Sequence, residues 1–235
     1  MKFYTTAAII PFLPLLASAV PCATSTASVS AAPTSSSSPS GVPYAGAGAG
    51  SGLTPAQIKL IAPKSASCAN VTTFTDECRT AEQAAPALTT AFLNYGVTSK
   101  AEQAAVLGLI AFESGEFRYA RNHFPEPGNP GQGTRNMQSP TFNQEYGASF
   151  PSIADRIAEA GDDLSAMLDI ILEDPVRDFG SGAWFLTNHC DMEFRAPLQT
   201  GSEEGWEGFI TECVGTDANG DRRGYWVKAK QALGI

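Results

Sequence analysis

Apolar residues recur at helical spacing through most of the chain from residue 53 onward. In residues 99–113, Val106, Leu109 and Ile110 share one face, and most of the other positions are apolar too. A helix that is apolar almost all round must be covered on every side, so this segment is predicted to be the central helix. The chain shows no run of strands, which predicts a mainly α fold. Further helices are predicted at residues 82–93, 151–161, 162–173, 175–186, 202–213 and 221–233.

The two ends of the central helix carry distinct signals. Ser99 and Glu102 are spaced as a capping box that opens the helix. Glu113 lies on the same face as the apolar stripe, at the point where Ser114-Gly115 is expected to end the helix. A carboxylate beside apolar surface is expected to have a raised pKa, and such a group can protonate a leaving oxygen. The alternative is a helix-end glutamate whose head lies in water.

Residues 114–150 are rich in Gly and Pro and show little periodicity. They are predicted to form a long ordered loop or short hairpins lining a cleft, and a long loop in a compact domain is often functional. Gly131 and Gly133 allow a tight turn, and amide side chains cluster near aromatic residues. The alternative is a purely structural turn. The residues predicted to bind sugar hydroxyls are Gln132, Arg135, Asn136, Gln138, Asn143 and Tyr146.

The beginning of the chain predicts export. Residues 1–19 combine Lys2, an apolar run and Ala17-Ser18-Ala19, which is typical of a secretory signal peptide. Residues 20–52 are mostly Ser, Ala, Thr, Pro and Gly, a composition typical of a disordered and O-glycosylated linker. Residues 53–235 have ordinary globular composition and are predicted to form one domain.

Five cysteines follow the predicted signal peptide, and export makes disulfides expected. Four of them allow three pairings; proximity along the chain favours Cys68 with Cys78 and Cys190 with Cys213. Cys22 is then left outside the domain. Asn70-Val71-Thr72 is an N-glycosylation sequon, which suits a surface loop beside the first disulfide in a glycoprotein.

Charge and composition exclude several classes of partner. The formal net charge of −9 argues against nucleic acid and favours a neutral or cationic glycan, although it also suits simple solubility. His123 and His189 lack the spacing of a zinc site, and Arg222 and Lys228 stand where a calcium loop from Asp217 would need Gly and Glu. We therefore predict a monomer with no cofactor, no metal and no membrane contact.

An apolar helix ending in Glu113-Ser114, followed by a polar Gly-x-Gly loop, resembles the lysozyme-like superfamily. The resemblance is strongest to family 19 chitinases, goose-type lysozymes and lytic transglycosylases, and it covers about residues 88–233. Asp174-Pro175, Ala183-Trp184-Phe185 and the segment Arg223-Gly224-Tyr225-Trp226 are similar to later parts of those chitinases. The resemblance implies that Glu113 is the general acid. The chain departs from the family in that Gln138 comes two residues late, Gln132 replaces an Arg and Phe112 replaces a His.

An inverting glycosidase also needs a second carboxylate to activate water. Glu126 lies where the resemblance places a base and is the first choice over Glu116 and Glu145. Lytic transglycosylases manage with one glutamate. The sequence thus predicts a secreted glycoside hydrolase acting on chitin, chitosan or peptidoglycan. The alternative is a non-catalytic lysozyme-like scaffold that binds a glycan or a host target.

Overall fold

The computed structural model describes residues 52–235, which form a mainly α structure of ten α-helices. The predicted signal peptide, most of the predicted linker and Cys22 lie outside the described residues. Two short turns, η1 (Pro63–Ala66) and η2 (Phe209–Cys213), supplement the helices. The helices are α1 (Pro55–Ile61), α2 (Ala81–Asn94), α3 (Lys100–Glu113), α4 (Pro140–Ala148), α5 (Ala154–Ala160), α6 (Leu164–Leu172), α7 (Pro175–His189), α8 (Met192–Gln199), α9 (Glu203–Gly208) and α10 (Gly220–Leu233).

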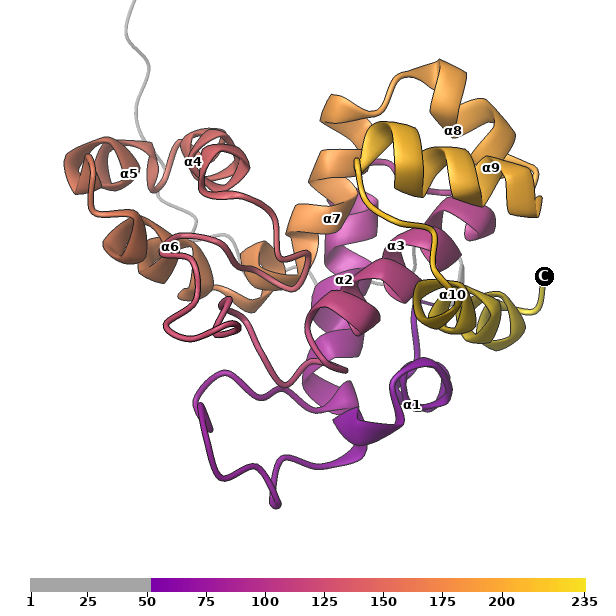
Figure 1. Ribbon diagram of the computed structural model, residues 1–235, viewed down its shortest axis with the longest axis horizontal. Helices are drawn as coiled ribbons and strands as arrows, with labels where there is room; N and C mark the ends of the chain where they lie inside the picture. The colour runs from indigo at the N-terminus through magenta and orange to yellow at the C-terminus, as the bar shows by residue number, and fades with distance from the viewer. Residues whose placement is uncertain (1–51) are drawn as a thin grey trace, which may run out of the picture. The chain divides into compact units, whose positions relative to one another are not determined.

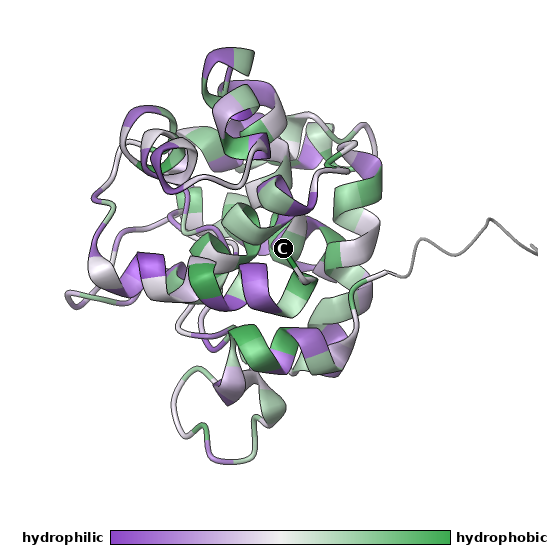
Figure 2. Ribbon diagram, turned by 90° about the vertical axis from the view of Figure 1, so that its right-hand side faces the viewer, coloured by the Kyte–Doolittle hydropathy of each residue, from purple (hydrophilic) through white to green (hydrophobic). Residues whose placement is uncertain are grey.

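Helix α3 lies at the centre of the described part of the chain, as its apolar composition predicts (Figure 1). Helices α10, α7 and α8 pack against it, and α2 pairs with α7. Helices α4, α5 and α6 gather on one side of α7, whereas α1, α8, α9 and α10 lie on the other (Figure 1). Hydrophobic and hydrophilic residues are interspersed along most of the helices (Figure 2). Within residues 52–235, no helix combines the length and apolarity needed to cross a bilayer.

The contact between α3 and α10 depends on a glycine. A Cβ atom added at Gly108 of α3 would lie 2.8 Å from both the backbone N and the Cα of Trp226 in α10. Backbone atoms cannot move aside as a flexible side chain can, so only glycine permits this spacing of the two helices. The close approach matters for function because α10 carries residues that contact the end of α3.

We expect Gly108→Ala to destabilise the protein by about 1–3 kcal/mol, because the added methyl group must push α10 away from α3. The measurement is urea unfolding followed by circular dichroism. Gly224→Ala in α10 is the matched control, since a Cβ there meets nothing within 4 Å. That control should be neutral or slightly stabilising because alanine favours the helix. Equal stability of the two variants would contradict the close-packing argument.

The two predicted disulfides are present. Cys68 pairs with Cys78, which closes the loop before α2, and Cys190 pairs with Cys213, which joins the end of α7 to η2. The first disulfide therefore ties down the segment that enters α2. The second holds the two ends of the α8–α9 segment together.

Several predicted elements differ in the structure. Residues 114–150 were predicted to lack helices, but α4 begins at Pro140 behind the Ser139 cap. The preceding part is an ordered loop with isolated β-bridges, Arg121 to Gly133 and Gly133 to Gln138. Helices α1 and α8 were not predicted. Both are short, and the only buried residue of α8 is Leu198, so neither shows a long apolar stripe.

The predicted helix caps are correct only in part. Ser99 accepts from the backbone N–H of Glu102, but the Glu102 side chain does not return to the cap. It is buried and bonds instead to Arg195 and Gln199 from α8 (2.8 and 3.1 Å). The last helix begins one residue before the predicted position, at Gly220, because Asn219 caps it by accepting from the N–H of Arg222 (3.0 Å). In the first case a cationic partner from a distant helix outcompetes a local hydrogen bond.

Candidate functional site

Glu113 is the last residue of α3, as predicted, and Ser114 and Gly115 form the turn that follows. The N–H of Ser114 bonds to the carbonyl of Ile110 (3.1 Å), and Gly115 takes a left-handed conformation with φ +59°. The Glu113 side chain is 20% exposed. The turn therefore brings a carboxylate from the central helix to the protein surface.

The surroundings of Glu113 differ from the expected apolar ones. Arg222 of α10 donates to Oε1 of Glu113 from Nε (3.1 Å) and from Nη2 (2.8 Å). The guanidinium also lies 4.5 Å from the centre of the Phe112 ring and donates to the carbonyl of Asp217. The side chain beside Glu113 is therefore a cation from a distant helix and not the apolar surface that the sequence predicts. Within residues 52–235, Oε2 of Glu113 accepts no hydrogen bond.

Glu116 lies three residues after Glu113, beyond the end of α3, and like Glu113 it is bonded by a side chain of α10. It is buried, and its carboxylate accepts from the Tyr225 hydroxyl (2.8 Å) and from the backbone N–H of Lys64 (2.6 Å). Tyr225 follows Arg222 by three residues, so one face of α10 holds both glutamates. Burial, and then the Glu116 carboxylate, raise the pKa of Tyr225 to about 12. Glu116 therefore anchors the turn after Glu113 instead of facing it across a cleft.

This pKa shift predicts how stability changes at alkaline pH. The folded-state pKa of about 12 exceeds the ordinary value of 10.0, so folding favours the protonated tyrosine. The resulting stabilisation is complete below about pH 10 and is lost as the pH rises toward 12. We expect Tyr225→Phe to lower stability at neutral pH and to flatten the decline between these values, measured by unfolding at several pH values. An identical decline in both proteins would contradict the assignment.

Arg135, predicted to bind substrate, is instead fully buried and bonded only to protein. It donates to Oδ2 of Asp178 (2.8 Å) and to the carbonyls of Phe117, Tyr119 and Glu77 (2.9, 3.1 and 2.6 Å). Burial raises the pKa of Asp178, and the Arg135 cation acts in the opposite direction. This side chain ties the turn after Glu113 to α7 and to the loop before α2.

Three other residues that were predicted to bind sugar form hydrogen bonds within the protein. Gln132 donates to the carbonyl of Met137 (3.0 Å) and accepts from Asn129 (2.8 Å). Asn143 is completely buried and donates to the carbonyls of Gly131 and Gln138, whereas its Oδ1 has no partner within the described residues. Tyr146 is also buried and donates to the carbonyl of Arg177 (2.9 Å). Gln132 and Asn143 thus bond to the backbone of the loop and Tyr146 to that of α7, which sequence spacing does not reveal.

Asn136 and Gln138 each have a side-chain polar atom without a hydrogen-bond partner within the described residues. Their side chains share one long hydrogen bond of 3.4 Å, and Oδ1 of Asn136 and Nε2 of Gln138 have no partner within the described residues. A Cβ added at Gly182 would lie 3.4 Å from Oδ1 of Asn136 and 3.1 Å from Ile110, one turn before Glu113. Buried polar atoms are normally satisfied, so these two are candidates to meet water or a ligand.

The structure does not bring Glu126 into contact with Glu113. Glu126 lies in an exposed loop between two prolines, and within residues 52–235 its side chain forms no hydrogen bond or ion pair. Glu145 is exposed as well, 3.2 Å from His189. The role of Glu126 as a base stays a prediction. In the described part of the chain, no cluster of three or more His, Cys, Asp or Glu side chains is placed to hold a metal ion.

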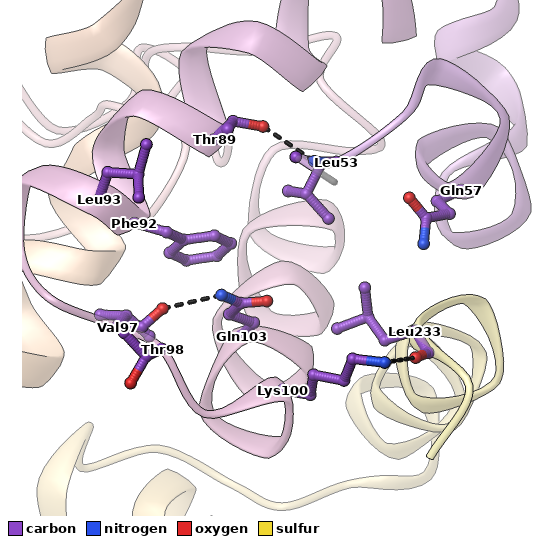
Figure 3. Close-up of a pocket in the computed structure, with 11 residues that line it drawn as sticks. Leu53, Gln57, Thr89, Phe92, Leu93, Val97, Thr98, Lys100, Gln103 and Leu233 are labelled. Atoms are coloured by element: carbon purple, nitrogen blue, oxygen red, sulfur yellow. Dashed lines mark hydrogen bonds between the residues drawn. The ribbon is translucent and has the colours of Figure 1, made fainter. Parts of the chain in front are cut away.

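A hollow of about 450 Å³ lies at the other end of α3 (Figure 3). Lys100 in its wall is about 20 Å along the helix from Glu113. Three polar side chains of this hollow already form hydrogen bonds: Lys100 donates to the carbonyl of Leu233, Gln103 to that of Val97, and Thr89 accepts from the N–H of Leu53 (Figure 3). A second hollow of about 460 Å³ lies beside Phe112, between Asp221 and Lys228. Only the second one adjoins the candidate site.

Comparison with known proteins shows a similarity over part of the chain. No family profile matches the chain. A bifunctional dioxygenase (DOX)-epoxy alcohol synthase (EAS) from Fusarium oxysporum (strain Fo5176) is 42% identical over 160 residues. The match covers 65% of this chain but only 12% of that protein. The chain is therefore similar to a small part of a much longer protein. The name of that protein refers to its full length and not to the matched part.

Proposed function

We propose that this chain is a secreted glycoside hydrolase with a lysozyme-like fold that cleaves β-linked amino-sugar polymers. The observation that carries the proposal is the position of Glu113. It ends the central helix at the surface, one carboxylate oxygen is held by Arg222, and the other has no partner in residues 52–235. A carboxyl group fixed through one oxygen presents the other in a defined direction, as a general acid requires.

The proposed reaction is hydrolysis of a glycosidic bond. Glu113 donates a proton from Oε2 to the bridging oxygen, and the bond from that oxygen to the anomeric carbon breaks with its electron pair on the oxygen. Water adds to the anomeric carbon, and its proton passes to a base, for which Glu126 is the candidate. If the enzyme is inverting, the two carboxyl groups should stand about 6.5–9.5 Å apart in the substrate complex.

Other features support a glycan substrate and an exported protein. The unpartnered amide atoms of Asn136 and Gln138 suit hydroxyl and N-acetyl groups, which both donate and accept hydrogen bonds. The two disulfides are compatible with an oxidising compartment. The net charge of −9 favours a neutral or cationic polymer over an anionic one.

One observation favours a second candidate, a non-catalytic scaffold that binds a glycan or a host target. Arg222 donates two hydrogen bonds to Oε1 of Glu113, and this contact can be explained without any reaction. In a scaffold the same ion pair would only fasten α10 to α3. The two candidates differ in whether the protein breaks a bond.

The deciding experiment incubates the full chain with chitin, chitosan and peptidoglycan and measures soluble oligosaccharides by mass spectrometry. The hydrolase proposal expects release from at least one polymer. The anomeric form of the first product, followed by NMR, then distinguishes inversion from retention. Binding without release from any of the three polymers would favour the scaffold.

A further inference from the structure

Four aromatic rings gather at the surface beyond the turn that follows α3. They come from two segments of the chain: Phe74 lies in the disulfide-closed loop, and Tyr119, His123 and Phe124 follow Glu113. Phe74 is stacked on His123 with ring centres 3.5 Å apart, and Tyr119 meets Phe74 and Phe124 edge to face at 6.3 and 5.9 Å. Phe74 is 39% exposed and Phe124 is 58% exposed. We call these four residues the aromatic platform.

The buried residue Glu77 holds the platform in place through hydrogen bonds. Nε2 of His123 lies 2.8 Å from Oε1 of Glu77, a buried residue whose other oxygen accepts from the N–H groups of Ala120 and Arg121 (2.7 and 3.1 Å). Phe74 itself has φ +52°, a conformation that bulky residues rarely adopt. Strain of this kind persists only where the surrounding structure imposes it, and it often marks functional sites. One face of the Phe74 ring is thus backed by His123, and the side chain is held at the surface.

The platform begins at the turn that follows Glu113. A Cβ added at Gly115 would lie 3.1 Å from the ring of Tyr119, so that ring rests on the residue two positions after Glu113. Tyr119 then contacts Phe74 and Phe124 further out. A polymer bound with one glycosidic bond at Glu113 and extending past Gly115 would place its neighbouring sugar rings on the platform.

We infer that the aromatic platform is a binding subsite for an N-acetylated β-linked amino sugar of the polymer substrate; this inference rests on the proposed function. The face of a pyranose ring presents C–H groups, which match the negative face of an aromatic ring. A stacked nucleic-acid base would also need cationic groups for its phosphates. Here Arg121 is already paired with Asp169 (2.8 Å), and the chain is acidic. A neutral sugar fits both the rings and the charge.

The test measures binding of the N-acetylglucosamine hexamer to the full chain by calorimetry, in a Glu113→Gln background that keeps the ligand intact. Phe74→Ala and Phe124→Ala are each expected to weaken binding by about fivefold to tenfold, the loss of one stacking contact. Leu93→Ala is the matched control, because Leu93 is a 74% exposed apolar residue at the wall of the hollow in Figure 3. It should bind as the parent does, and circular dichroism should show all variants folded.

The outcomes separate the subsite from the proposed function. Unchanged affinity in both phenylalanine variants, or no binding by the parent, overturns the subsite even if the enzyme cleaves polymer. Weakened binding supports the subsite even if the parent protein cleaves no polymer, which would refute only the catalytic role. Asn70→Gln, in the same disulfide loop, should bind equally. Tighter binding by that variant would show that the protein's own glycan covers the platform and would overturn the assignment to substrate.

Discussion

Replacing Glu113 by glutamine is expected to lower the rate of oligosaccharide release by at least about 10²-fold. The amide keeps the shape of the side chain and its carbonyl oxygen still accepts from Arg222, but it has no acidic proton to donate. Folding should change little, since the residue is partly exposed and the hydrogen bonds to Arg222 remain. The measurement is the initial rate on whichever polymer the parent protein cleaves.

Glu204→Gln is the control for this prediction. Glu204 is exposed in the first turn of α9 and forms no ion pair within the described residues, so the same chemical change there should leave the rate unaltered. Glu126→Gln belongs in the same series as the test of the predicted base. Full activity of Glu113→Gln on a polymer that the parent cleaves would refute the proposed mechanism.

Arg135→Met is expected to destabilise the protein by about 3–5 kcal/mol, the usual cost of removing one partner of a buried ion pair. The change leaves Asp178 buried without its cation and also removes donors from the carbonyls of Phe117, Tyr119 and Glu77. The free energy of unfolding is measured in urea by circular dichroism and tryptophan fluorescence.

Two further variants make this prediction specific. Arg156→Met removes the exposed pair with Glu173 and should shift the unfolding midpoint very little, because water screens such pairs. The double variant Arg135→Met with Asp178→Leu should recover part of the lost stability, since no unpaired charge is then buried. An Arg135→Met protein as stable as the parent would show that the buried pair does not hold the loop.

Helix positions could be predicted where the local signals were strong. Helices α2, α3, α7 and α10 combine an apolar stripe with a capping residue or a proline at the start, and both signals lie within a single helix. The short helices were harder. The buried residues of α4 are Asn143, Tyr146 and Gly147, which form no apolar stripe, so only its Ser139-Pro140 start could have revealed it.

The candidate site could be predicted only as far as its position. The end of α3 at Glu113 follows from the chain itself, whereas the partner of Glu113 is Arg222, 109 residues later. Nothing in the spacing of the polar loop distinguishes Arg135, which is buried, from Asn136, which keeps an unpartnered oxygen. The aromatic platform was also missed, because Phe74 and His123 are brought together by the disulfide loop and by Glu77.

The sequence by itself determined the mainly α class, the central helix and its last residue, and the pairing of the four cysteines near each other along the chain. These depend on residues within a turn or a loop of one another, whose interactions are already present in the local pattern. The tertiary structure alone decided which polar side chains serve the fold and which remain available to a ligand. That choice depends on burial and on partners from distant helices, because a buried polar group must be paired wherever its partner lies in the chain.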